Sequence, residues 1–319
     1  MTQFEDDPSI GPDQGPSDQS RPDGEYPASR PAAARPVGDV ITYAADPPIY
    51  PGETREGVYS SKPPLPEDLR VPWSWVHFVV FLFFTFASFV VVQTGLAIYY
   101  APQQHLTNEQ LERYLLNKPE FLFGSTIICS ALIFLFLYVT LSVLRDFPFW
   151  RTLGWRPLRP NAMGRKPSPW IYFFSGLVLA IFVAFAGSQV HTKEGLPIQE
   201  IFKSNKTAMI FMAMAVFVAP LVEETVFRGY LFPLFARSFG VVPGILLTGL
   251  LFGMMHGYQL GWTWGIVTLL VLVGVIFTSV RAYTGTVFAS FLMHLGYNSM
   301  IAAAAVISTH GFTRIPPGP

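Results

Sequence analysis

A succession of apolar stretches, most of them close to the length of a membrane-spanning helix, fills the chain from about residue 74 onward. About 20 apolar residues cross the ~30 Å of bilayer hydrocarbon, and helices satisfy their own backbone hydrogen bonds there. The pattern therefore predicts an all-α fold, a polytopic transmembrane helix bundle of about seven spans. Six to eight spans are compatible with it, because the fifth stretch is short and Pro220 can interrupt the fourth. The expected spans are 76–99, 121–144, 170–190, 207–235, 242–257, 262–280 and 286–307.

The composition excludes an ordinary soluble domain. Of 319 residues, 51% are hydrophobic and 15% aromatic, whereas only 13% are charged, about half of the charged share usual in soluble proteins. Cys129 is the single cysteine and lies in an apolar run. One chain therefore contains neither a disulfide nor a cysteine-based metal site.

Residues 1–70 differ in composition from the rest of the chain. They are rich in Pro, Gly, Ser and Asp, and they hold 13 of the 21 acidic residues but only 6 of the 21 basic ones. With so little periodic apolar content, this segment is predicted to be a disordered cytoplasmic tail, a solvated spacer rather than a docking segment. It lacks the basic start and short apolar core of a secretory signal peptide, so the first span is expected to act as the insertion signal.

The connector 145–166 predicts the orientation of the spans. It contains six basic residues and only Asp146 as an acid, which is typical of a cytoplasmic loop. Alternating the spans from this loop places the N-terminal tail in the cytoplasm and the C-terminus outside, with Arg237 and Arg281 in cytoplasmic turns. The expected parts are the tail at 1–70, two N-terminal transmembrane helices with the basic loop at 71–169, and a core at 170–310.

An acidic pair inside the fourth stretch is the first functional feature. Glu223, Glu224 and Arg228 are the only charged residues between Lys206 and Arg237. A bilayer makes such charges costly unless each faces a partner or a wet cavity. Glu224 precedes Arg228 by four residues, which is the favourable order for a helical ion pair. Arg228 is therefore predicted to neutralise Glu224, and Glu223 is left to face elsewhere.

Polar side chains on three spans are expected at a similar depth. Counted from the expected cytoplasmic helix ends at ~1.5 Å per residue, Glu223 and Asn298 lie ~18 Å deep, His256 ~21 Å and His294 ~12 Å. His294 and Asn298 are four residues apart and present an imidazole and an amide from one face of the last span. These positions predict one polar layer inside the membrane.

One free carboxylate, two imidazoles and an amide suit peptide-bond hydrolysis. A buried Glu can act as a general base toward water, a His can relay the proton, and neutral donors can stabilise an oxyanion. Other protease types are disfavoured, because the sequence has no His-Glu-x-x-His or Gly-x-Ser-x-Gly motif and only Asp146 as an aspartate after Asp68.

Three short motifs resemble those of a known family. The chain contains, in this order, Glu-Glu-x-x-x-Arg at 223–228, Phe-x-x-x-His at 252–256 and His-x-x-x-Asn at 294–298. Together they resemble the motifs of the CPBP intramembrane proteases, also called the Abi family, which includes type II CAAX prenyl endopeptidases and bacteriocin-immunity homologues. The resemblance covers about residues 170–307.

The resemblance implies a role for each matching residue. Glu223 would be the base that activates water, assisted by His256. His294 and Asn298 would stabilise the oxyanion of the tetrahedral intermediate. These four residues are the candidate catalytic set.

The other two charges of the first motif, Glu224 and Arg228, would be structural partners of that set. No cofactor is expected, because the family resemblance favours a metal-free glutamate mechanism and because an Asn is a better donor than zinc ligand. Zinc is the alternative, since Glu223, His256 and His294 would then form a two-His, one-carboxylate metal site.

These features predict an intramembrane endopeptidase that hydrolyses a peptide bond of a membrane-associated protein or peptide, in CAAX-type or related processing. The compact chain and its tail favour a bacterial plasma membrane, where a secreted peptide, a signal-peptide remnant or a membrane regulator fits better than a prenylated protein. The expected partners are the lipid bilayer and that substrate, with no nucleic acid. One alternative is a non-catalytic bacteriocin-immunity or membrane-binding protein of the same family. The other is a proton-coupled transporter, although no internal repeat is visible.

Overall fold

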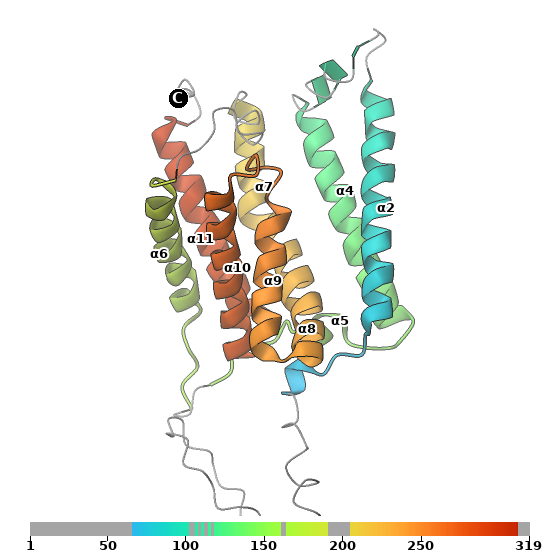
Figure 1. Cartoon of the computed structure of the whole chain (residues 1–319), viewed down its shortest axis with the longest axis vertical. Coiled ribbons are helices and arrows are strands. Elements are labelled where there is room, and N and C mark those ends of the chain that lie inside the picture. Colours follow the sequence, from blue (N-terminus) through green and yellow to red (C-terminus); the bar gives the residue numbers. More distant parts are fainter. Residues whose placement is uncertain are drawn as a thin grey trace, which may run out of the picture. The chain divides into compact units, whose positions relative to one another are not determined.

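The computed structural model describes residues 66–311 except 102–105, 108–109, 112–113, 116–117, 161–163 and 191–204. All regular structure in these residues is helical, as the apolar stretches predict (Figure 1). Of the predicted tail, residues 1–65 lie outside the described residues. Only 66–70, its last five residues, can be compared with the prediction.

Six helices are long and apolar enough to cross a membrane, which makes the protein a multi-pass integral membrane protein. The short helix α9, Val241–Met255, is apolar but has 15 residues, or about 22 Å at 1.5 Å per residue. The predicted helix bundle is confirmed, with six candidate spans in the described residues and the shorter α9 where the fifth span was expected. The six are α2 (Trp75–Tyr100), α4 (Pro119–Tyr138) with its π-helical extension Val139–Val143, α6 (Pro169–Gly187), a composite helix over Asn205–Phe239, α10 (Trp264–Thr284) and α11 (Val287–Ser308).

The helices α2 and α4 lie side by side (Figure 1). Phe136 of α4 stacks on Phe84 of α2 with ring centroids 4.7 Å apart, and it also contacts Phe81. Phe81 in turn contacts Tyr230 of the composite helix, with centroids 4.9 Å apart. The outer face of α2 exposes large apolar side chains such as Phe83, as expected of a surface in contact with lipid.

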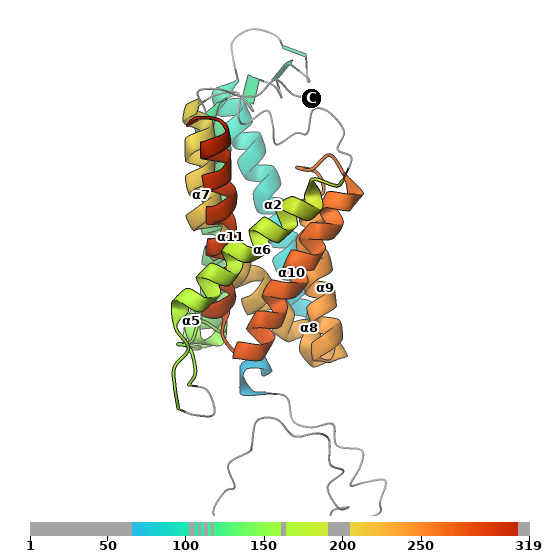
Figure 2. The ribbon, with the colours of Figure 1, turned by 90° about the vertical axis from the view of Figure 1, so that its left-hand side faces the viewer.

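Glycines allow close approach between the other helices. A Cβ atom on Gly176 of α6 would collide with the backbone of α11, and one on Gly296 of α11 would collide with the backbone of α6, where the two helices cross (Figure 2). Gly249 and Gly253 of α9 face the backbone of α10 in the same way. Such small residues permit the close packing that holds helices together in lipid.

A strap formed by residues 66–74 lies against the ends of α10 and of the composite helix. Its 3-10 helix, Glu67–Leu69, packs its leucine in a buried cluster with Phe232. Oδ2 of Asp68 lies 2.8 Å from Nη1 of Arg281 in the last turn of α10, and both side chains are buried. Residues 66–70, assigned to the tail by composition, therefore belong to the folded part of the chain. Arg281, expected in a turn between spans, lies in the last turn of α10 and is buried.

The basic connector also packs into the bundle. After the short helix α5, Phe149–Thr152, Leu153 is fully buried. The carbonyl oxygen of Gly154 accepts a hydrogen bond from the amide of Val287 at the start of α11. Gly154 has a φ of 82°, which favours glycine. The connector thus fixes the start of α11 in addition to carrying positive charge.

Candidate active site

The composite helix changes its winding where the acidic pair begins. The first part, α7 (Asn205–Glu223), continues through Pro220, and a π-helical segment, Glu224–Leu231, leads into α8 (Phe232–Phe239). Proline has no amide hydrogen to donate, and π-helical turns occur frequently at functional sites. The interruption expected near Pro220 is therefore a change of helix type. All residues of the π-helical segment except Val226 are buried.

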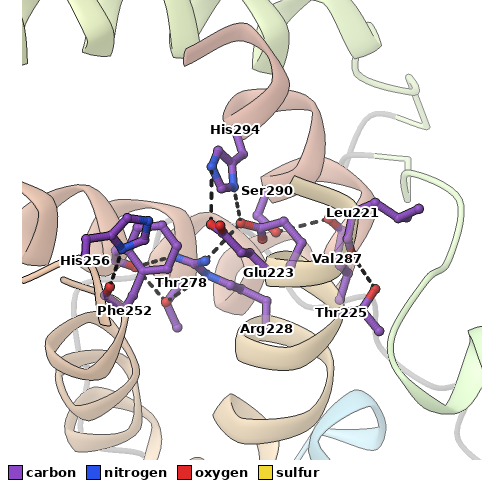
Figure 3. A network of polar contacts seen from close by, with 12 residues as sticks. Leu221, Glu223, Thr225, Arg228, Phe252, His256, Thr278, Val287, Ser290 and His294 are labelled. Carbon is purple, nitrogen blue, oxygen red and sulfur yellow. Dashed lines mark hydrogen bonds and ion pairs between the residues drawn. The ribbon is translucent and has the colours of Figure 1, made fainter. Parts of the chain in front are cut away.

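Glu224 is the centre of a buried charge cluster. Its Oε1 accepts a hydrogen bond from Nη1 of Arg228 at 2.9 Å, and both side chains are 0% exposed. The ion pair predicted from their spacing is confirmed. Nδ1 of His294, on α11, lies 3.0 Å from the same oxygen (Figure 3). Two partners thus offset the cost of removing this carboxylate from water.

Glu223 lies beside the same imidazole. Its Oε2 is 3.8 Å from Nε2 of His294, and 24% of its side chain remains exposed. His294 therefore lies between the two carboxylates, with Nδ1 toward Glu224 and Nε2 toward Glu223. If the Nδ1 proton is donated to Glu224, Nε2 is the nitrogen that can exchange a proton with Glu223 or with a bound water.

His256 follows the last turn of α9. Its Nδ1 lies 2.8 Å from the carbonyl oxygen of Phe252, one turn earlier. The ring of Phe252 contacts both imidazoles, with centroids 4.9 Å from His256 and 5.8 Å from His294. In the described residues no hydrogen bond or ion pair joins His256 to Glu223. Phe252 thus contacts both imidazoles, while Nε2 of His256 stays available to a substrate or a water.

Asn298 lies one turn beyond His294 on α11. Its amide nitrogen donates a hydrogen bond of 2.7 Å to the carbonyl oxygen of Ala215 on α7. This bond ties the last span to the helix that carries the acidic pair. Because an amide group has two N–H bonds, one donor remains for another partner.

The arrangement can be compared with the zinc alternative. Within the part of the chain that the structure describes, no three His, Cys, Asp or Glu side chains are placed so that they could hold a metal ion. Glu223 and His294 lie close together, but His256 makes no hydrogen bond or ion pair with either of them in the described residues. The residues of the expected two-His, one-carboxylate set therefore do not fit a zinc ion in this arrangement.

Contacts from α10 were not predicted from the sequence. Arg228 donates from Nε to Oγ1 of Thr278 at 3.3 Å and from Nη2 to the carbonyl oxygen of Gly274 at 3.0 Å. Its guanidinium carbon also lies 4.4 Å from the ring centroid of Phe252 and 5.3 Å from that of Phe277. The only signal in the sequence was one hydroxyl among several in an apolar helix, which does not distinguish Thr278.

An apolar pocket of about 430 Å³ lies along α7, on the N-terminal side of Pro220. None of the candidate site residues lines it, so it is not the place where the polar chemistry would occur. Its lining is Met209, Ile210, Ala213, Met214, Phe217 and Val218.

Fold and site together define a class of protein: a multi-pass membrane protein whose helices enclose a cluster of two glutamates, an arginine and a histidine. Residues 205–300 match the family described as type II CAAX prenyl endopeptidase Rce1-like. This segment contains all three motifs, so the resemblance to the CPBP family of CAAX proteases is confirmed for the domain at 205–300. No curated protein and no solved structure matches the chain.

Proposed function

We propose that this protein is an intramembrane endopeptidase that hydrolyses a peptide bond of a membrane-associated protein or peptide, in CAAX-type or related processing. The observation that carries the proposal is the coincidence of the matched domain with the buried cluster around Glu224. Placing charged groups inside apolar helices costs free energy, and a protease site would give these charged groups a catalytic function. The lipid bilayer and a membrane-associated substrate are the partners that this function requires.

Glu223 is proposed as the general base. Glu224 is fully buried and already accepts from Arg228 and His294, whereas Glu223 keeps an exposed portion that water can reach. Glu223 would take a proton from water as the water oxygen bonds to the carbonyl carbon of the peptide. When the C–N bond breaks, the proton would pass to the departing amine, with His256 assisting the transfer.

His294 and Asn298 are proposed to stabilise the oxyanion, His294 as an imidazolium whose Nδ1–H donates to Glu224 and whose Nε2–H is free to donate to the oxyanion. They stand one turn apart on α11, and Nε2 of His294 lies 3.8 Å from Glu223. Charge developing on the carbonyl oxygen would therefore appear close to both the base and the donors, where preorganised donors are most effective. The free N–H of Asn298 would supply the second hydrogen bond.

We propose that the reaction needs no metal. The basis is the donor set itself: Glu223 and His294 lie together, the third expected ligand, His256, is not grouped with them in the described residues, and the amide of Asn298 is a hydrogen-bond donor. We also propose that the N-terminal side faces the cytoplasm, because the connector 145–166 carries six basic residues and one acid. A bacterial cell is proposed from the compact chain and its N-terminal tail. In such a cell the substrate would be an unprenylated membrane-proximal peptide.

The test is cleavage of a quenched membrane-peptide library by the purified protein in detergent, with a farnesylated CAAX peptide and its unmodified form as two defined members. Glu223→Gln and His256→Ala should abolish or strongly reduce cleavage while the folded protein persists. Glu120→Gln, an exposed acid at the start of α4, is the matched control and should cleave as the wild type does.

Each arm is repeated with and without a zinc chelator. Cleavage that survives chelation and is lost in Glu223→Gln supports the metal-free glutamate mechanism. Loss on chelation with recovery on added zinc would replace it with a metalloprotease. Absence of turnover on any peptide by folded wild-type protein would instead support the non-catalytic binding or immunity function.

A further inference from the structure

The helix α10 presents a buried stripe toward the charge cluster although none of the three motifs lies on it. Gly274, Phe277, Thr278 and Arg281 are spaced at i, i+3, i+4 and i+7, and all four are buried. This spacing places them on one face of a helix. Arg281 binds the strap at one end of the stripe, and the other three residues meet Arg228.

Thr278 and Gly274 form a two-atom acceptor for the guanidinium of Arg228. Oγ1 of Thr278 donates to the Gly274 carbonyl oxygen at 2.7 Å and accepts from Nε of Arg228 at 3.3 Å. The same carbonyl oxygen accepts from Nη2 of Arg228. Nη1 is the nitrogen that meets Glu224. The planar guanidinium is thus held by α10 on one side and by the acid on the other, which fixes its orientation.

The contacts continue from Arg228 to the candidate catalytic residues. Oε1 of Glu224 accepts from both Arg228 and His294, so the position of the guanidinium determines where that oxygen lies. The oxygen in turn orients the imidazole whose other nitrogen faces Glu223. A rotation of Arg228 would therefore displace His294, which the proposed mechanism places at the oxyanion.

We infer that Thr278 is a positioning residue of the active site: its hydroxyl locks the Arg228 guanidinium so that Glu224 holds His294 in the orientation needed for hydrolysis. The inference rests on the proposed function and deepens it, because it adds a fourth helix to the three that carry the motifs. Thr278 would touch no substrate and would act through Arg228 alone.

The test compares Thr278→Val, which removes the hydroxyl at nearly constant volume, with Thr278→Ser, which keeps it. Thr248→Val is the matched control. Thr248 is equally buried, and its hydroxyl donates at 2.7 Å to the carbonyl of Gly244, four residues earlier, on α9. Both threonines therefore make the same bond within their helix, and only Thr278 also binds Arg228.

Two measurements are made on the full-length protein in detergent. The first is kcat and KM on the best peptide of the library. Thr278→Val should lower kcat about ten-fold and change KM by no more than about two-fold. The substitution disturbs the orientation of His294 in the transition state and leaves substrate binding intact. Thr278→Ser should recover to within about three-fold of the wild type, and Thr248→Val should match the wild type.

The second measurement does not depend on cleavage. In protein labelled with 15N-arginine, the Nε–H resonance of Arg228, assigned by its loss in Arg228→Lys, should shift and lose protection from solvent exchange in Thr278→Val only. Equal losses of kcat in Thr278→Val and Thr248→Val would overturn the inference, as would a shifted resonance with unchanged kcat. Absence of cleavage by the wild-type protein would overturn both the proposed protease function and the role of Thr278. Loss of activity in Glu223→Gln together with unchanged activity in Thr278→Val would overturn the role of Thr278 alone.

Discussion

Neutralising Asp68 should destabilise the protein far more than neutralising its neighbour Glu67. The two acids are adjacent on the strap, and each meets an arginine. Asp68 lies 2.8 Å from Arg281, with side chains 7% and 0% exposed. Glu67 lies 3.7 Å from Arg156, and its own side chain is 70% exposed. Asp68→Asn and Glu67→Gln are therefore a matched pair that differs mainly in burial.

The expected magnitude follows from what each substitution leaves behind. Removal of the Asp68 charge leaves the Arg281 guanidinium buried, and its Nε already has no hydrogen-bond partner in the described structure. Breaking one side of a buried pair costs about 3 to 5 kcal/mol. Because Asp68 lies at the edge of the folded part, we expect about 3 kcal/mol, or roughly a hundred-fold change in the folding equilibrium. An exposed pair such as that of Glu67 is worth less than about 1 kcal/mol.

The assay is reversible unfolding in mixed micelles, with sodium dodecyl sulfate titrated against a mild detergent and helix content followed by circular dichroism. A double variant, Asp68→Leu with Arg281→Met, should be more stable than Asp68→Asn, since it removes both charges and leaves neither uncompensated. The reasoning is refuted if Asp68→Asn unfolds at the same denaturant fraction as Glu67→Gln.

Two further predictions concern packing. Gly249→Val should lower the free energy of unfolding by more than about 2 kcal/mol in the same assay, because the valine side chain would collide with the backbone of α10. Gly95→Val, where nothing lies within 4 Å of the added Cβ, should leave the free energy of unfolding unchanged. Equal effects of the two substitutions would contradict the close approach of α9 and α10. Trp73→Phe should lower the free energy of unfolding by about 1 kcal/mol. It removes the hydrogen bond from the indole nitrogen to the Tyr230 carbonyl oxygen but keeps an aromatic ring that can stack on Tyr230. Trp170→Phe, at an exposed position, is its control, and an equal loss there would argue against a role for the indole N–H.

Features that depend on nearby residues could be predicted from the sequence. The spans follow from the length of apolar runs, and their predicted ends lie within four residues of the helix ends in all six cases. The pairing of Glu224 with Arg228 follows from a four-residue spacing. Both are consequences of local chain geometry, so no knowledge of the tertiary fold was needed.

Features that join distant segments could not be predicted. Asp68 lies in a segment that has the composition of the acidic tail, and its partner Arg281 is 213 residues away in the sequence. The contact of His294 with Glu224 spans 70 residues, and that of Thr278 with Arg228 spans 50. Charge patterns assigned one partner to Glu224, but the packing of α11 supplies a second. The π-helical winding after Pro220 likewise depends on neighbours that bury the segment from several sides.

The strap also sets an order of events in biosynthesis. Its aspartate is made at the beginning of the membrane domain, yet the arginine that it binds appears only when α10 has emerged, 213 residues later. Until then the strap can pack only against the composite helix, and Asp68 has no buried partner. Long-range contacts of this kind form late because a long loop must close first. The start of the folded chain is consequently among the last parts to reach its final place, and its docking marks the completion of the bundle.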